Sequence, residues 1–451
     1  MTGSRVTVVG GGILGMTAAL ELAERGHQVT LLERAPTLGG LVASHTIGSV
    51  VWDRFYHVIL PQDTETLEMI RRLGIESGLR WETTKTGFFV DGRWYSLSTT
   101  WEYLRFPPLG LVDKVRLGFT ILRAAAIADG TPLEAVPVTD WLRRWSGRRT
   151  FERIWLPLLR SKLGENYRVA SAAFIWAYIR RLYAARQSTG KREVMGYVVG
   201  GYATILAAFE RALQQAGVTI RVGCRVREVV VRGSAVAVDT EEGEVASDHV
   251  VLTTPATSAP TLCPWMSPEE AGRAQRVTYQ GVICASVLVR RPLKGFYVTN
   301  ITDGGLPFTT IVEMTGLVNP AAFGGHTLLY LPRYATQRDD WWQKTDAEIE
   351  AAFLAGVERM DPSFRRDDVL AFRVARARAV QAIATLHYSR DVVPATTTSH
   401  PRVHLINSAQ IINGTLNVHE TIGVARKKIA ELAPTLAAVA RSVGPVAGAA
   451  R

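Results

Sequence analysis

Cysteine is scarce in this chain, which has three thiols, Cys224, Cys263 and Cys284, among 451 residues. They are too few and too scattered for a disulfide framework or a paired-cysteine metal site. We therefore expect the three cysteines to be small, buried, apolar side chains, and the protein to lie in a reducing compartment. No uninterrupted apolar stretch reaches the roughly 18 residues that a membrane-spanning helix needs. Because the first glycine motif begins within ten residues of Met1, we expect no signal peptide and predict a cytoplasmic protein.

Several familiar catalytic motifs are also missing. The chain contains no GxSxG, HExxH or P-loop sequence. His404 and His419 lie near the C-terminal motif described below but lack the spacing of metal ligands, so we predict no metal site. The 47% of apolar and 21% of charged residues are ordinary for a globular protein, which excludes disorder for most of the chain.

Positive charge is distributed unevenly. The chain carries 52 basic and 41 acidic residues, and the segment 143–193 alone holds 13 basic, 3 acidic and eight aromatic residues. This segment can be a solvated basic face over an aromatic helical core, or a pocket for an anionic, phosphate-bearing substrate. It can also be a membrane-surface patch, continued by the apolar run 101–122. Because no recognition fold accompanies the charge, we predict no nucleic-acid partner.

The N-terminal residues have the pattern of a dinucleotide-binding unit. Residues 5–9, RVTVV, are typical of a buried strand, residues 13–24 of a helix, and residues 27–33 of a second strand. Two parallel strands joined by a helix require a right-handed crossover. The pattern therefore predicts an α/β fold with a doubly wound sheet. Further along the chain, residues 85–97 are typical of a hairpin with its turn at Asp91-Gly92, and residues 218–231 are typical of a strand.

The turn between the first strand and the helix has the motif Gly10-x-Gly12-x-x-Gly15. Gly10 permits a tight turn, Gly12 lets the backbone approach a pyrophosphate, and Gly15 allows close contact between helix and strand. The helix begins at Ile13 and Leu14, whose free N–H groups and positive helix dipole favour an anion. The motif in this context predicts a dinucleotide site.

The residues after the second strand indicate which dinucleotide binds. Glu33 ends that strand 18 residues after the last glycine of the motif and can accept two hydrogen bonds from a ribose diol. The sequence continues from Arg34 to the pair Gly39-Gly40, which resembles the extended signature of two-dinucleotide-binding flavoproteins. The resemblance implies that these residues and Leu41 contact FAD. The family usually has Arg where Leu41 stands, so no guanidinium can stabilise phosphate there.

Two later segments carry the resemblance further. The strand around Val226 resembles the flavoprotein return strand, whose backbone would contact adenine. Residues 403–425 resemble the closing FAD motif, in which Thr415, Leu416 and Asn417 would begin a helix facing the flavin. Gln410 stands where the family usually has an acidic residue, and its amide can still bond a ribityl hydroxyl.

The chain as a whole resembles the flavin amine oxidase, protoporphyrinogen oxidase and phytoene desaturase superfamily, with some likeness to UDP-galactopyranose mutase in residues 53–60. The resemblance implies tightly bound FAD in a two-dinucleotide-binding, Rossmann-like domain with a helical insert and a mixed-sheet substrate domain. We predict three FAD-binding parts, at residues 1–98, 194–257 and 396–435. A basic helical insert is predicted at residues 99–193 and the substrate domain at residues 258–395. Residues 436–451 are predicted to be a flexible tail.

The resemblance also implies an activity. We predict an FAD-dependent oxidoreductase that removes hydride from a C–N, C–O or C–C unit of a small biosynthetic substrate, which the basic segment suggests is anionic. A redox-neutral mutase acting on a nucleotide sugar and a flavoprotein without catalysis are the alternatives. Because flavin itself accepts hydride, the protein need supply few reactive groups.

Five side chains are candidates for catalysis or substrate binding. His57 can be a hydrogen-bonding or proton-handling group beside the flavin, or a core histidine. Tyr388 can line the substrate side or be a structural aromatic. Arg180 and Arg181, with Tyr183 beside them, lie in a predicted helix where a guanidinium could hold a phosphate or carboxylate bidentately. The predicted partner is a small molecule, peripheral membrane contact is the alternative, and the oligomeric state stays open.

Overall fold

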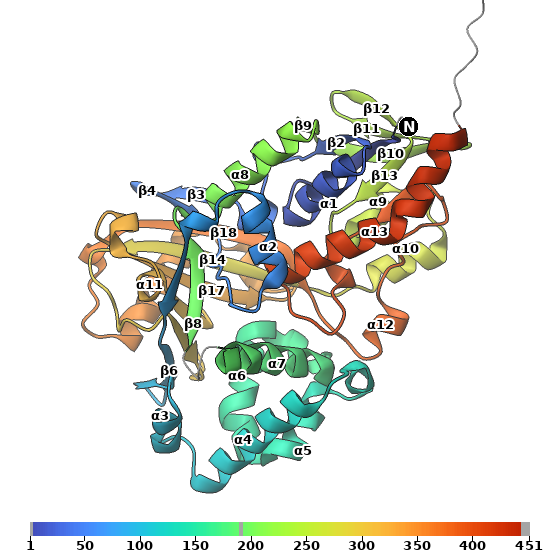
Figure 1. Cartoon of the computed structure of the whole chain (residues 1–451). Coiled ribbons are helices and arrows are strands. Elements are labelled where there is room, and N and C mark those ends of the chain that lie inside the picture. The colour runs from blue at the N-terminus through green and yellow to red at the C-terminus, as the bar shows by residue number, and fades with distance from the viewer. Residues whose placement is uncertain (1–2, 189–192, 443–451) are drawn as a thin grey trace, which may run out of the picture.

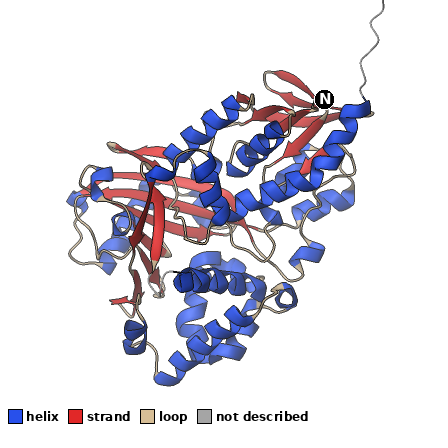
Figure 2. Cartoon of the chain, in the orientation of Figure 1, coloured by secondary structure: helices blue, strands red, loops and turns tan. Residues whose placement is uncertain are grey.

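The computed structural model describes residues 3–188 and 193–442. Figure 1 shows the N-terminus within a sheet at the top of the view, a second large sheet at the left, and a group of helices at the bottom. In Figure 2, which has the same orientation, the strands of both sheets are red, and the group at the bottom is blue because it consists of helices. The predicted α/β class with a helical insert and a mixed sheet is therefore confirmed.

The first sheet is parallel and consists of five strands in the order β19 (Val403–Leu405), β13 (His249–Leu252), β1 (Arg5–Val9), β2 (Gln28–Leu32) and β9 (Thr219–Arg221). Its helices are α1 (Ile13–Glu24), α8 (Gly201–Gln215) and α13 (Val418–Ser442). Residues of these helices share one apolar core with β1 and β2. The chain order reverses between β1 and β13, and such a switch point is where doubly wound sheets bind their ligands.

A small antiparallel sheet lies next along the chain. It contains β10 (Val226–Arg232), β11 (Ala235–Thr240) and β12 (Gly243–Ser247), and is followed by helices α9 (Ala259–Leu262) and α10 (Pro268–Gln275). The sequence pattern predicted one strand over residues 218–231, but the structure divides it into β9 and β10. Gly223 lies between them with φ of +68°, a conformation that ends an extended strand.

The third sheet is mixed and has seven strands in the order β18 (Val369–Ala382), β14 (Tyr279–Val289), β17 (Thr327–Ala335), β16 (Thr310–Glu313), β15 (Val298–Ile301), β6 (Thr86–Val90) and β7 (Arg93–Ser96). Helix α11 (Asp346–Met360) packs on one face through apolar residues. The predicted hairpin turn at Asp91-Gly92 is present, with φ of +51° and +70°. This hairpin lies within predicted segment 1–98, so that segment contributes strands to the mixed sheet as well.

The helical insert consists of α3 (Thr100–Arg105), α4 (Leu111–Ala126), α5 (Val138–Thr150), α6 (Leu156–Leu163) and α7 (Ala172–Ser188). A π-helical turn, Phe151–Trp155, joins α5 to α6. Most aromatic side chains of the basic segment are buried between these helices, among them Phe151, Trp155 and Trp176. These helices therefore share one apolar core, to which Phe88 and Val90 of β6 also belong, and most cationic side chains of the basic segment are exposed around it.

The remaining elements connect these layers. They are β3 (Ser44–Ile47), β4 (Val50–Asp53), α2 (Thr64–Arg72), β5 (Leu79–Thr83), β8 (Val194–Val198) and α12 (Tyr388–Asp391). Helix α13 continues through Pro434, so the beginning of the predicted flexible tail is helical, and residues 443–451 lie outside the described residues. All three thiols are free and buried, as predicted. Within the described residues, no helix is long and apolar enough to cross a membrane.

Candidate active site

The glycine motif forms the turn between β1 and α1. Gly10 has φ of +111°, which L side chains rarely adopt. A Cβ on Gly15 would lie 1.8 Å from the Gly10 carbonyl oxygen, so only glycine lets α1 pack this close to the turn. A Cβ on Gly12 would meet no atom nearer than the Gly40 Cα, at 4.0 Å. Gly12 therefore presents bare backbone to open space.

The start of α1 faces the same open space. No side chain caps the helix, and Gly12, Ile13 and Leu14 line a cavity there. The first N–H groups of a helix have no partner within the helix, and the helix dipole makes their end positive. Open backbone next to unpaired N–H groups fits an anionic group such as a pyrophosphate.

Glu33 forms part of the cavity wall next to the start of α1. Its two carboxylate oxygens accept backbone hydrogen bonds, one from the Gly11 N–H at 2.6 Å and one from the Ala35 N–H at 2.8 Å. Glu33 and Arg34 both line the cavity. Each carboxylate oxygen has a second acceptor position, so the same side chain can still receive hydroxyl groups from a ligand.

The paired glycines lie against the first turn. Gly39 and Gly40 have φ of +120° and +57°, and the Gly39 N–H donates to the Gly11 carbonyl at 2.8 Å. This bond fixes the second loop beside the first, where a side chain on either glycine would be strained. Leu41 follows them and also lines the cavity.

The C-terminal segment closes the cavity from another direction. Thr415, Leu416 and Asn417 line it immediately before α13. The Asn417 side chain caps the helix, since Oδ1 accepts from the Glu420 N–H at 2.9 Å and Nδ2 donates to the Thr415 carbonyl at 2.7 Å. Val226, at the start of β10, lines the cavity as well.

These walls belong to one cavity of about 2560 Å³. Pockets for a single small ligand usually measure about 300–1,000 Å³, so this one has room for a dinucleotide and a second molecule. Beyond the glycine loops it extends into the helical insert. The side chains that line this extension are mostly apolar, among them Phe106, Leu109, Leu117, Ile121, Ile154, Trp155, Leu158, Phe174 and Ile179.

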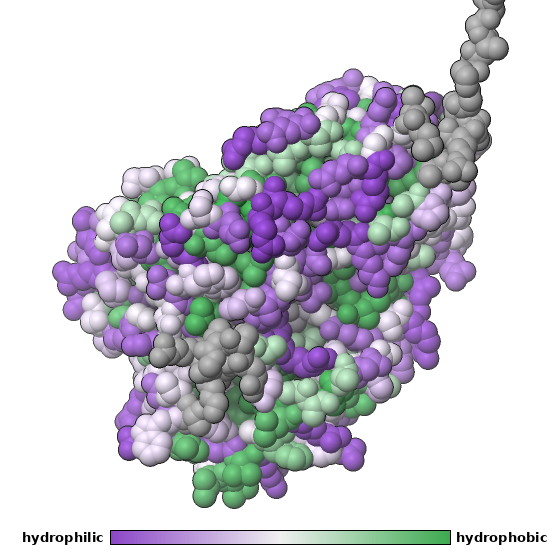
Figure 3. Space-filling view, viewed as in Figure 1, coloured by the Kyte–Doolittle hydropathy of each residue, from purple (hydrophilic) through white to green (hydrophobic). Residues whose placement is uncertain are grey.

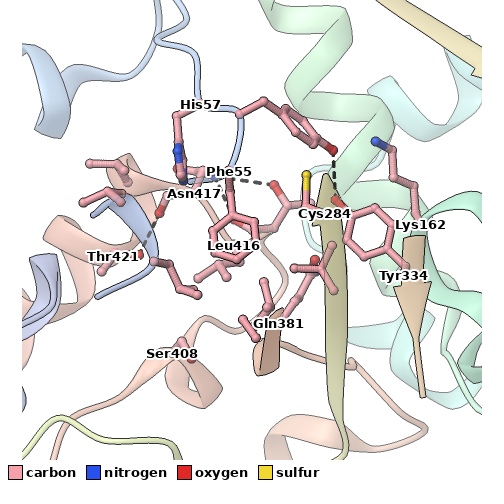
Figure 4. Close-up of a pocket in the computed structure, with 18 of the residues that line it drawn as sticks. Phe55, His57, Lys162, Cys284, Tyr334, Gln381, Ser408, Leu416, Asn417 and Thr421 are labelled. Atoms are coloured by element: carbon pink, nitrogen blue, oxygen red, sulfur yellow. Dashed lines mark hydrogen bonds between the residues drawn. The ribbon is translucent and has the colours of Figure 1, made fainter. Parts of the chain in front are cut away.

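His57 lies in the cavity wall, on the side of Asn417 (Figure 4). Its ring is 5.0 Å from the Tyr202 ring, and its Nδ1 is buried without a hydrogen-bond partner. Burial lowers the pKa of His57 to about 4, because a charged imidazole would lose its hydration. At neutral pH the ring is therefore uncharged and has a vacant hydrogen-bonding position.

Lys162 and Tyr334 lie on the opposite side of the view in Figure 4, and Tyr56 also lines the cavity. The Lys162 Nζ lies 5.9 Å from the centre of the Tyr334 ring, and the Tyr334 and Tyr56 hydroxyls are 2.9 Å apart. Among the described residues, no carboxylate forms an ion pair with Lys162. Burial lowers the pKa of its amine to about 8, which leaves most of it charged at pH 7. Burial also raises the pKa of the Cys284 thiol nearby, so that thiol stays protonated.

Comparison with known proteins identifies the family to which this chain belongs. The model of the family described as flavin-containing amine oxidoreductase matches residues 15–417. The chain belongs to this family. The predicted FAD cofactor and the predicted class, an FAD-dependent oxidoreductase, are thereby confirmed. Among the described residues, no group of His, Cys, Asp or Glu side chains is arranged to hold a metal ion.

Individual members of the family are distant relatives. A flavin-dependent L-tryptophan oxidase of Lentzea aerocolonigenes is 35% identical over 138 residues, which cover 29% of each chain. A hydroxyneurosporene desaturase of Rubrivivax gelatinosus is 28% identical over 281 residues, 55% of this chain and 53% of that protein. The matches thus span about half or less of these relatives' length. No relative found supports the mutase alternative.

The fold agrees with solved structures over nearly the whole chain. An oxidoreductase from Methanosarcina mazei superimposes with a TM-score of 0.76, covering 95% of this chain and 100% of that one at 16% identity. At such low identity the likeness shows a shared fold, and the amine oxidoreductase assignment rests on the family model.

The predicted anion-binding arginines differ in position within this amine oxidoreductase. Arg180 is exposed outside the cavity, where it donates to the Ala128 carbonyl at 2.8 Å. Arg181 lines the cavity, but its Nη2 lies 2.8 and 3.0 Å from the two oxygens of Asp63. Tyr183 lines the cavity as well. The geometry therefore gives neither arginine a guanidinium that is free to bind an anionic substrate.

Two other predicted residues lie behind the cavity wall. Tyr388 is buried, and its hydroxyl donates to the Ala409 carbonyl at 2.8 Å. The Gln410 Nε2 donates to the Leu405 carbonyl at 3.1 Å. Neither residue lines the cavity, whereas Asn407, on the same loop as Gln410, does. Tyr388 and Gln410 thus hold the closing loop in place.

The sequence analysis missed the polar side chains of the substrate half. Trp155, Leu158 and Lys162 follow helical spacing, and all three line the cavity, so the pattern of one lysine on an apolar face could have drawn attention to Lys162. Tyr56 and Tyr334 are 278 residues apart in the chain, and no local pattern indicates that they pair.

Proposed function

We propose that this chain oxidises a substrate with a long apolar body and a polar head, by removing hydride from a carbon in a C–N, C–O or C–C unit. The apolar extension of the cavity carries this proposal. Its lining comes from the helical insert, where side chains such as Leu117, Trp155 and Phe174 would contact the substrate body. Each methylene buried there contributes about 0.8 kcal/mol.

The cofactor would occupy the glycine-rich end. Gly12, Ile13 and Leu14 would hold the pyrophosphate through backbone N–H groups, and Glu33 would accept the ribose hydroxyls. The support is geometric, because the turn is open at Gly12, α1 has no cap, and Glu33 faces the cavity. Asn417 and its neighbours would close the other end of the site.

The polar head would lie near Lys162. This amine is mostly charged at pH 7, has no carboxylate partner among the described residues, and lies 5.9 Å from the centre of the Tyr334 ring, whose hydroxyl is hydrogen-bonded to that of Tyr56. A carboxylate is the group that such a combination would hold, through one ion pair and hydrogen bonds from hydroxyls. The residue proposed to bind the anion is therefore Lys162, instead of Arg180 or Arg181.

The chain itself has to orient the substrate and exclude water. When bound, the flavin would supply the hydride acceptor. The apolar walls would fix which carbon of the substrate approaches it, and would keep water out. His57 is neutral and has a vacant nitrogen, so it would hold a hydrogen bond at the cofactor side without adding charge.

Anaerobic mixing with two matched substrate series tests the proposal. Long-chain 2-amino acids and long-chain unsaturated carboxylic acids are each compared with their short-chain counterparts, and the loss of oxidised-flavin absorbance is followed. We expect bleaching by at least one long-chain series, with about fourfold tighter binding for each added methylene that enters the apolar extension. Bleaching by short polar compounds alone would contradict the proposal, and a need for prior reduction without net bleaching would favour the mutase.

A further inference from the structure

The helical insert exposes a group of large apolar side chains on one surface. We call it the α3–α4 patch, and it consists of Trp101, Leu104, Leu111, Val112, Val115, Phe119 and Leu122, each between 49% and 75% exposed. Figure 3 shows hydrophobic surface at the lower end of the molecule, where Figure 1 places α4. A soluble monomer rarely exposes a contiguous apolar surface of this kind without a function for it.

Helix α4 is apolar on two opposite faces. Leu111, Val115, Phe119 and Leu122 follow i, i+4 and i+3 spacing along its outer face. Its inner face packs on the insert through buried residues that include Leu117. The outer face contacts the rest of the insert through the Phe119 and Trp145 rings, whose centres are 6.0 Å apart, but half or more of the Phe119, Val115 and Leu111 side chains stays exposed.

Cationic side chains border the outer face. Arg116 and Arg123 follow on one side of α4, and Lys114 lies on the other. On α3, the Arg105 guanidinium lies 4.4 Å from the centre of the Trp101 ring. Tryptophan with basic side chains at the edge of an apolar helix face is the composition of a helix that lies in a membrane interface.

Negative charge is almost absent from this surface. Helices α3 and α4 contain two acidic residues, Glu102 and Asp113. The Glu102 carboxylate caps α3 by accepting from the Ser98 and Thr99 N–H groups, and Asp113 is buried. A second copy docked here by two-fold symmetry would bring the same cations together, whereas an anionic lipid surface would attract them.

The patch and the cavity meet on α4. Leu117, Gly118 and Ile121 line the cavity from the inner side of the helix. Leu122 lines it and is also exposed on the patch, and Leu182 of α7 both lines the cavity and is 40% exposed. The apolar extension therefore reaches the edge of the α3–α4 patch.

We propose that the α3–α4 patch docks on an anionic lipid bilayer, with α4 lying in the plane of the interface. An apolar substrate then passes from the lipid into the cavity between Leu122 and Leu182. The docking stands on the surface itself. The substrate path rests on the proposed function, because it assumes an apolar substrate.

Sedimentation with lipid vesicles tests the docking. The full-length holoprotein is mixed with vesicles of phosphatidylcholine alone or with phosphatidylserine added. We expect binding to the anionic vesicles, and at least about a tenfold loss of affinity in the double variant Val115→Asp, Phe119→Asp, because the apolar face can no longer enter the interface. The matched control, Val51→Asp with Val169→Asp, adds the same charge at exposed valines elsewhere and should bind as the unchanged protein does.

Two results would overturn the docking proposal. One is equal vesicle binding by the patch variant and the control. The other is a dimer, seen by sedimentation velocity without lipid, that only the patch variant loses while the unchanged protein ignores vesicles. Flavin content and thermal stability, measured on each variant, show that both fold. Vesicle binding needs no turnover, so its failure leaves the proposed function standing, and a failure of long-chain substrates to bleach the flavin leaves the docking result standing.

Discussion

The two ends of the cavity are built by different means. At the cofactor end, backbone geometry makes the turns that face the proposed pyrophosphate site, and these turns lie close together in the chain, from Gly10 to Gly40. At the substrate end, side chains make the site, and they come from segments far apart in the chain, as Tyr56 and Tyr334 do. The glycine turns of the cofactor end can therefore be recognised in one stretch of sequence, whereas the side chains of the substrate end come together only on folding.

The difference has a consequence for variants. A change at the cofactor end should reduce flavin content, and a change at the substrate end should alter turnover while flavin stays bound. Each variant below is chosen to separate these two outcomes or to show that they are coupled.

The largest effect is expected from Gly15→Ala. The added Cβ would lie 1.8 Å from the Gly10 carbonyl oxygen, so either α1 or the glycine turn must move. Overpacking of this kind costs about 1–3 kcal/mol or more, and here the displaced backbone is the cofactor cradle itself. We expect nearly complete loss of bound flavin, measured as the ratio of flavin to protein absorbance after purification.

Gly272→Ala is the control for this change. Gly272 lies in helix α10, and its added Cβ would meet no atom nearer than 4.0 Å. Alanine stabilises helices relative to glycine, so we expect full flavin content and an unchanged or slightly higher melting temperature. Normal flavin binding by Gly15→Ala would mean that the turn adapts, and that the cofactor end is less dependent on glycine than its geometry indicates.

The next effect concerns two adjacent arginines of the helical insert. Arg181→Ala would leave the Asp63 carboxylate, 3% exposed, without its cation, and losing one partner of a buried pair costs about 3–5 kcal/mol. Arg180→Ala removes an exposed side chain and should change stability by no more than about 0.5 kcal/mol. Denaturant unfolding of the two variants measures the contrast. Equal losses would show that the ion pair contributes nothing.

The fold could be predicted from the sequence where residue type dictates the backbone. The glycine motif and the paired glycines adopt the expected turns, and the Asp91-Gly92 hairpin has the expected positive φ at both residues. Strand boundaries were less accurate, as the break at Gly223 shows, because a short glycine turn interrupts an otherwise β-rich run. The pattern of apolar residues cannot tell a bend from a continuous strand.

The candidate site could be predicted only in part. The predicted cofactor residues from Gly12 to Leu14 line the cavity, whereas Gln410 and Tyr388 lie behind it. Their side chains bond to backbone carbonyls that only the folded loop brings near. The charge count identified a basic segment but could not indicate which cation faces inward. Lys162 does so because α6 turns that face to the cavity, while the charge of Arg181 is neutralised by an aspartate 118 residues away.

A smaller effect is expected at Glu33. Its carboxylate holds the Gly11 and Ala35 N–H groups and is proposed to bind the ribose. Glu33→Ala should weaken FAD binding by about 1.5–3 kcal/mol, because hydrogen bonds to a charged group are lost. Glu33→Gln keeps one acceptor oxygen and should fall between. Equilibrium dialysis of FAD with refilled apoprotein gives the ranking, and equal affinity in all three proteins would place the ribose elsewhere.

The smallest effect, and the one that tests the substrate end by itself, is expected from Lys162→Met. Methionine keeps an unbranched apolar side chain that is one atom shorter than that of lysine, and it removes the charge. For a substrate with a carboxylate head we expect a KM several-fold higher at pH 7, with unchanged flavin content. In the unchanged protein KM should rise as the pH increases through about 8, where the amine loses its proton, and the variant should show no such rise. A KM that is independent of both the variant and the pH would remove Lys162 from substrate binding.

The stability of the same pair of proteins tests whether Lys162 is buried as described. The pKa of its amine is lowered from 10.5 to about 8 by burial, so between these pH values the unfolded chain binds more protons at this residue than the folded chain. Stability therefore rises with pH in that window, as the folded protein is relieved of a buried charge. Below pH 8 the full cost of that charge is present, and Lys162→Met should be the more stable protein. The difference should shrink from pH 8 to 10.5, and denaturant unfolding across this range would show it. A difference that stays constant would mean that the amine is solvated. The substrate end would then have no buried charged group at Lys162.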